Sequence, residues 1–149
     1  TQDAKTIINN LARDKSGNIT ETIKIITHSM GSAYGKGFVA SLKDYIRTLP
    51  IVLQKQIKIT LVADFDPFQA SDFKADSDIR TIQFRHANNW NILGLGWLAN
   101  EIEEGANLIA SQQKKNSSSH SIFSFFNDIQ LLSEGTYKWD DVNQKWVAQ

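Results

Sequence analysis

Two short apolar runs with an amphipathic stretch between them constrain the fold of this chain more than any other feature. Residues 22–27 and 57–63 consist mostly of isoleucine, valine, leucine and threonine, a composition typical of strands buried on both faces. Residues 29–48 place large apolar side chains three and four positions apart, the spacing of one helical face. A helix that joins two such strands makes them parallel neighbours, so the sequence predicts an α/β domain with a mainly parallel sheet.

The rest of the chain adds weaker signals around this unit. A third strand is expected at residues 80–85, and a β-hairpin is expected where residues 136–139 and 145–148 flank a polar loop. Three further stretches have the apolar spacing of a helix: residues 3–13, part of residues 88–113, and residues 122–132. From this length and composition we expect residues 1–149 to fold as one domain.

Charge and cysteine content exclude several classes of function. The 16 acidic side chains balance the 16 basic ones, so no long-range field would attract nucleic acid. Cysteine is absent, which excludes a disulfide framework and a thiolate nucleophile. The longest apolar stretch, residues 91–99, has roughly half the length needed to span a bilayer. The acidic stretch at residues 64–78 lacks the glycine and distal glutamate of a loop-type calcium site, so we expect neither a metal nor an organic cofactor.

Ser29 stands where the first strand meets the helix, in the segment Thr27-His28-Ser29-Met30-Gly31. A nucleophile elbow needs a strained turn that exposes the serine, with small residues two positions before and after it so that strand and helix can approach. Gly31 fits this pattern, whereas Thr27 is larger than the glycine usual there. The alternative is an ordinary helix N-cap, because serine is a preferred capping residue. The backbone distinguishes the two, since an elbow serine has a positive φ and a capping serine lies in the β region.

This segment resembles the Gly-His-Ser-Met-Gly and Gly-His-Ser-Leu-Gly elbows of lipases and esterases with the α/β-hydrolase fold. The resemblance implies a serine hydrolase that cleaves carboxylic esters, with lipid or acylglycerol esters as the main subclass and thioesters or amides as related substrates. It implies that Ser29 is the nucleophile and that the Met30 N–H donates to the oxyanion. It also implies the chain order serine, acid, histidine.

The acid that this order implies is Asp66. It comes shortly after the strand at residues 57–63, and Asp66-Pro67 is similar to the Leu-Asp-Pro of the neutral lipases related to pancreatic lipase. Residues 85–90, at the end of the next strand, offer amides but no carboxylate. Asp64 stays open as a second candidate, because it follows the same strand directly.

The chain has three histidines that could supply the base. His28 precedes the nucleophile, where the side chain of an elbow points away from the site. His120 comes after the candidate acid and leads from a serine-rich loop into a predicted helix, similar to the position of lipase histidines. The implied triad is therefore Ser29, Asp66 and His120, with His86 as the alternative base.

The resemblance covers residues 23–129, the C-terminal half of the hydrolase fold. A complete α/β-hydrolase has several strands before the elbow, one of which leads into the second oxyanion donor, whereas only one predicted helix precedes residue 23 here. We therefore expect the elbow strand to lie at a sheet edge, completed by a second copy of the chain or by an N-terminal segment of a longer protein. The competing function is a non-catalytic interaction domain, the C-terminal module of a larger surface or toxin-type protein.

Overall fold

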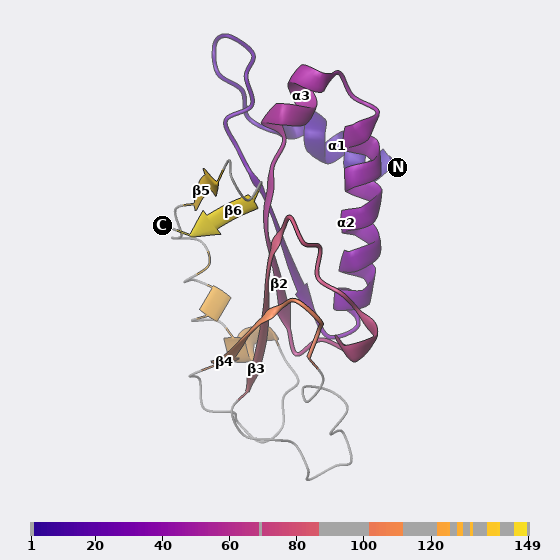
Figure 1. The fold of residues 1–149 in the computed structure, drawn as a ribbon, viewed down its shortest axis with the longest axis vertical. Helices are drawn as coiled ribbons and strands as arrows, with labels where there is room; N and C mark the ends of the chain where they lie inside the picture. The colour runs from indigo at the N-terminus through magenta and orange to yellow at the C-terminus, as the bar shows by residue number, and fades with distance from the viewer. Residues whose placement is uncertain are drawn as a thin grey trace.

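Figure 1 shows the fold in a computed structural model, which describes residues 2–68, 70–86, 102–111, 122–125, 128–129, 132, 137–140 and 145–148. Its centre is a four-stranded sheet in the order β1-β2-β3-β4. The strands are β1 (Ile23–His28), β2 (Ile59–Phe65), β3 (Arg80–His86) and β4 (Asn107–Ser111). All three neighbouring pairs are parallel, which confirms the predicted α/β class with a mainly parallel sheet.

Three helices lie on one side of this sheet: α1 (Gln2–Asn10), α2 (Gly31–Arg47) and α3 (Ile51–Gln56). The buried residues of α2 recur at steps of three and four, namely Ser32, Gly35, Val39 and Leu42. Val39 and Leu42 pack in one apolar cluster with strand residues that include Ile23 and Val62. Within the described part of the chain, none of the helices is both long and apolar enough to cross a membrane.

The opposite face of the sheet carries a second apolar cluster, in which three phenylalanines pack together with aliphatic side chains. Phe65 of β2 stacks on Phe84 of β3 with ring centroids 4.5 Å apart. Phe125, in the 3-10 helix η3 (Ile122–Phe125), packs against Phe65 with a centroid separation of 5.0 Å. Because apolar layers cover both faces, every residue of β2 is buried, as is typical of an inner strand in a parallel sheet.

Two elements differ from the sequence-based expectations. β4 was not predicted, because the helix expected within residues 88–113 rested on Leu93, Leu95, Leu98 and Ile102, and the first three of these lie outside the described residues. Its five residues carry only two large apolar side chains, Leu108 and Ile109, a pattern too short to separate strand from helix. α3 has no counterpart among the predicted helices, because its six residues fall between Pro50 and the next strand. Pro50 takes the N-cap position of α3 with φ −54.

The C-terminal end of the chain forms a separate two-stranded sheet. β5 (Tyr137–Asp140) pairs antiparallel with β6 (Lys145–Ala148). Residues 141–144, which connect them, lie outside the described residues, so the hairpin turn stays a prediction. The helix expected at residues 122–132 begins as η3, and several of its later residues also lie outside the description.

The aromatic layer predicts a matched pair of substitutions in η3. Phe125 is fully buried against the sheet, whereas Phe123 is 79% exposed. Phe125→Ala should lower the free energy of unfolding by about 3–5 kcal/mol, because it leaves a cavity beside Phe65. Phe123→Ala should change it by no more than about 0.5 kcal/mol. Urea unfolding of both variants measures the difference, and equal losses would contradict the packing of η3 on the sheet.

Candidate active site

The backbone of Ser29 is left-handed. Ser29 links β1 to α2 with φ 55, a conformation that is unfavourable for residues other than glycine. Met30, not Ser29, takes the N-cap position of α2, and no side chain bonds to the helix amides there. No described residue hydrogen-bonds to the Ser29 hydroxyl. The geometry is that of an elbow rather than of a capping serine, and the hydroxyl is available for other contacts.

Backbone hydrogen bonds tie this turn to the end of the neighbouring strand. The Ser29 N–H donates to the Phe65 carbonyl at 3.0 Å, and the Phe68 N–H donates to the Ser29 carbonyl at 3.2 Å. The Ser32 N–H donates to the same Ser29 carbonyl at 3.0 Å. Three bonds, from β2, from the loop after it and from α2, therefore hold the left-handed residue. This agrees with the rule that such strain persists only where the surroundings fix it.

Asp66 adopts a second left-handed backbone next to this turn. It follows β2 with φ 42, and its N–H donates to the Phe84 carbonyl at 3.0 Å. The register pairs His28 with Phe65, so Ser29 and Asp66 are the next residues along neighbouring parallel strands. The structure therefore brings the expected nucleophile and the expected acid to the same edge of the sheet, and Asp66 is buried there.

Thr27 fits at the position where an elbow usually has glycine because the helix has a glycine instead. A Cβ placed on Gly35 of α2 would lie 2.5 Å from the Cγ2 methyl of Thr27, closer than real Cβ atoms approach other atoms. The strand and the helix therefore still approach closely, because the glycine stands on the helix here and not on the strand. The departure of Thr27 from the elbow pattern is compensated within this chain.

Asp64, the second candidate acid, lies in a buried polar network under α2. Its side chain is 0% exposed, and it accepts a hydrogen bond from the Thr27 hydroxyl. Its other oxygen lies 2.8 Å from the Lys36 Nζ of α2. Both carboxylate oxygens of Asp64 therefore already have partners on the helix side of the sheet. This favours Asp66 over Asp64 as the residue that would orient a catalytic histidine.

Glu103 is a member of this network that sequence reasoning did not find. Its carboxylate is 2% exposed and lies 2.7 Å from the Lys36 Nζ, and its N–H donates to Gln83 of β3 at 3.0 Å. Burial raises the pKa of Glu103 above its ordinary value; Lys36 acts against this shift and the nearby Asp64 adds to it. In the sequence Glu103 belongs to an acidic run typical of a solvated loop, so no local pattern marks it as buried.

The base is the part of the predicted triad that the structure does not place. His120 lies outside the described residues. His86 ends β3 opposite Ser111 of β4, and its side chain is not among those described. His28 is the last residue of β1, directly before Ser29. The described part of the candidate site is therefore the turn at Ser29 and the neighbouring Asp66.

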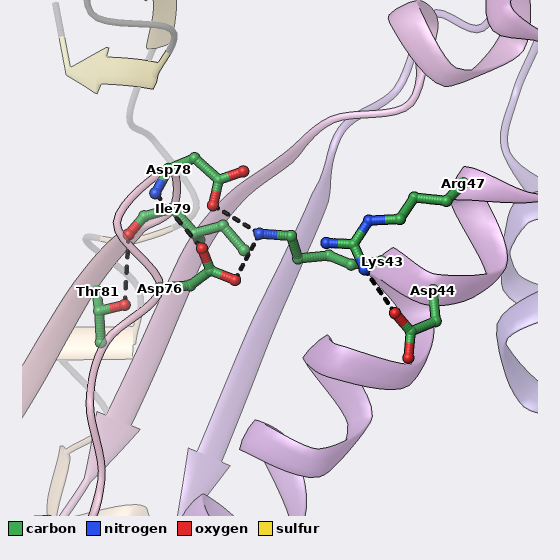
Figure 2. A network of polar contacts seen from close by, with 7 residues as sticks. All are labelled: Lys43, Asp44, Arg47, Asp76, Asp78, Ile79 and Thr81. Atoms are coloured by element: carbon green, nitrogen blue, oxygen red, sulfur yellow. Dashed lines mark hydrogen bonds and ion pairs between the residues drawn. The ribbon is translucent and has the colours of Figure 1, made fainter.

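The acidic loop between β2 and β3 is held by a lysine, as Figure 2 shows. The Lys43 Nζ of α2 lies 2.6 Å from Asp76 and 2.7 Å from Asp78. Burial opposes the charge on Lys43, but the hydrogen bonds to both aspartates outweigh it and raise its pKa. Across the described residues, no group of three or more histidine, aspartate or glutamate side chains has the arrangement of a metal site.

A cavity of about 210 Å³ lies at the other end of the sheet. Its walls include Ile46 of α2, Gln54 of α3, Ile59 at the start of β2 and Ile79 before β3. Ser29 and Asp66 follow the opposite, carboxyl ends of their strands, where ligands bind in open parallel sheets. We therefore place the candidate site at the turn and not in the cavity.

Comparison of the chain with protein-family models, with curated proteins and with solved structures finds no match. The chemistry of the site therefore follows from its residues and geometry.

The fit between Thr27 and Gly35 predicts a double-mutant effect. Gly35→Ala should lower the free energy of unfolding by about 1–3 kcal/mol, because the new methyl overlaps the Thr27 Cγ2. On a Thr27→Ser background the overlap is gone, and the same change should be neutral or stabilising by up to about 1 kcal/mol. Gly37→Ala is the control, since nothing lies within 4 Å of a Cβ there. Thermal unfolding tests this, and equal effects at Gly35 and Gly37 would contradict the fit.

The raised pKa of Glu103 predicts a pH-dependent stability difference. Above the ordinary value of 4.5 and up to the raised value, the folded protein keeps a proton that the unfolded chain releases. Stability should therefore fall as the pH rises through this window, and Glu103→Gln should remove that fall. Urea unfolding at pH 5, 6, 7 and 8 measures it, with Glu104→Gln as the exposed control. A constant difference between wild type and Glu103→Gln at all pH values would contradict the prediction.

Proposed function

We propose that this chain is a serine hydrolase with an α/β-hydrolase-like fold that cleaves carboxylic esters, with Ser29 as its nucleophile. One observation carries the proposal: Ser29 has φ 55 at the carboxyl end of a parallel strand, while Met30 takes the cap position. A serine that only capped the helix would have no reason to adopt the strained backbone. The strain has a function if it presents the hydroxyl to a substrate.

In this proposal the triad is Ser29, Asp66 and His120. The Ser29 Oγ attacks the ester carbonyl carbon while His120 takes the hydroxyl proton, and Asp66 orients the imidazole. The Met30 N–H donates to the oxyanion. The carbon–oxygen bond to the alcohol then breaks, and the alcohol leaves with the proton from His120. Water, activated by the same base, hydrolyses the acyl-enzyme and restores the serine.

Lipid or acylglycerol esters are the substrates we propose, with thioesters and amides as related possibilities. Apolar side chains beside the turn support this choice. Met30 and Tyr34 lie one helical turn apart at the start of α2, and they are 69% and 74% exposed. Exposed apolar surface next to a nucleophile suits an acyl chain better than a polar substrate.

The strand that leads into Ser29, β1, lies at the edge of the described sheet. Among the described strands, β1 has β2 as its one neighbour and ends the sheet order. Ile26, in the middle of β1, is about half exposed, although strands of parallel sheets are normally covered. We propose that a strand from outside these residues, in a second copy or an N-terminal segment of a longer protein, pairs with β1. A loop after it would supply the second oxyanion donor.

A fluorophosphonate probe tests the proposed function, because it reacts covalently only with an activated serine. We expect labelling of the wild-type chain at Ser29, located by peptide mass spectrometry, and none in Ser29→Ala. Asp66→Asn and His120→Ala should each slow labelling by about 10³–10⁴-fold. Ser16→Ala, in an exposed turn, and His86→Ala should leave the rate unchanged.

Each contrary outcome has a defined meaning. An unlabelled Ser29 in a folded protein overturns the enzymatic proposal in favour of a non-catalytic interaction domain. Loss of labelling in His86→Ala instead of His120→Ala moves the base to His86 and keeps the reaction. An unchanged rate in Asp66→Asn removes Asp66 from the orienting role.

A further inference from the structure

We propose that Thr27, Ser32 and Asp64 are positioning residues that hold Ser29 in its left-handed form through a side-chain clamp across the turn. The proposal deepens the one above, because it rests on Ser29 as the nucleophile. The elbow pattern assigns these positions no function, and at position 27 it asks only for a small residue. In this chain each of the three residues makes a hydrogen bond that connects to the backbone of Ser29.

The clamp closes across the turn itself. Thr27 precedes Ser29 by two positions and Ser32 follows it by three, and their hydroxyl oxygens lie 3.1 Å apart. Both residues are buried. Thr27 has one hydroxyl proton, which it donates to Asp64. The Ser32 hydroxyl must therefore be the donor to Thr27, so each bond in the chain has a fixed direction.

Asp64 sets this direction because it is an acceptor held in place from two sides. Its second oxygen bonds to Lys36 at 2.8 Å, and Lys36 reaches Glu103 at 2.7 Å from the same Nζ. The register also places Asp64 directly opposite Thr27 on the neighbouring strand. A buried carboxylate that lost the Thr27 proton would be left with an unsatisfied oxygen, which makes this hydrogen bond hard to break.

Ser32 connects the side-chain hydrogen bonds to the backbone of Ser29. Its N–H donates to the Ser29 carbonyl at 3.0 Å, while its side chain is fixed to Thr27. The carbonyl orientation of Ser29 is thereby linked to the buried network below it. Because a left-handed serine is intrinsically unfavourable, loss of the clamp should let φ of Ser29 move toward its usual negative range and turn the hydroxyl away.

The test compares Thr27→Val, which removes the hydroxyl at nearly constant volume, with Thr27→Ser, which keeps the hydroxyl and removes the methyl. In Thr27→Val we expect amide hydrogen exchange at Ser29 and Ser32 to speed up by about tenfold or more beyond any increase at Leu42 in the same helix, which reports the loss of overall stability. The three-bond HN–Hα coupling of Ser29 should shift away from its wild-type value. Fluorophosphonate labelling should slow by about tenfold or more. In Thr27→Ser, exchange, coupling and labelling should all stay close to their wild-type values.

Exchange and coupling do not depend on catalysis, so the two proposals can fail separately. Unchanged exchange and coupling at Ser29 in Thr27→Val overturn the clamp, whatever the labelling shows. Faster exchange spread evenly over α2 also overturns it, because that indicates general destabilisation. An unlabelled wild type overturns the hydrolase, while the exchange data still decide whether the clamp holds the turn. If Thr27→Val does not fold, Ser32→Ala breaks the same clamp and leaves the Thr27–Asp64 bond intact.

Discussion

The parallel register between β1 and β2 decides where every described residue of the candidate site lies. It sets Thr27 opposite Asp64 and His28 opposite Phe65. From that alignment follow the backbone bond from Ser29 to Phe65 and the hydrogen bond from Thr27 to Asp64. A slip of one residue would turn Asp64 to the aromatic face and leave Lys36 without it. Register is therefore the constraint on which both the turn and the network below it depend.

The charges below the turn are an unusual choice for the inside of a small sheet. Removing one partner of a buried ion pair typically destabilises a protein by about 3–5 kcal/mol, whereas an apolar replacement of the whole pair is often neutral. Lys36, Asp64 and Glu103 thus do not explain the stability of the fold. These residues contribute more by fixing side-chain positions. The Asp64 carboxylate accepts from two donors, Thr27 and Lys36, and so holds both of their side chains in one rotamer. Here one of those donors is two residues from the candidate nucleophile.

Local patterns were sufficient for the crossover unit and for the turn. β-branched runs predicted β1 and β2, the three- and four-residue spacing predicted α2, and the small residues around Ser29 predicted its elbow geometry. β4 escaped because five residues with two large apolar side chains carry no clear period. Lys36 and Glu103 escaped for a different reason. They meet only after α2 and the segment that precedes β4 have packed on the sheet, and neither has a neighbour in sequence that signals the contact.

The shared space between Thr27 and Gly35 has a consequence for recognising related chains. The steric limit on such a turn applies to a pair of positions, one on the strand and one on the helix. The strand and the helix can approach closely if either position has a side chain small enough to leave room for the other. A motif that demands glycine two residues before the serine would reject this chain. A two-position pattern, in which threonine is accepted there provided that glycine follows eight residues later, would retain it. In chains that share the proposed turn, we expect these two positions to change together.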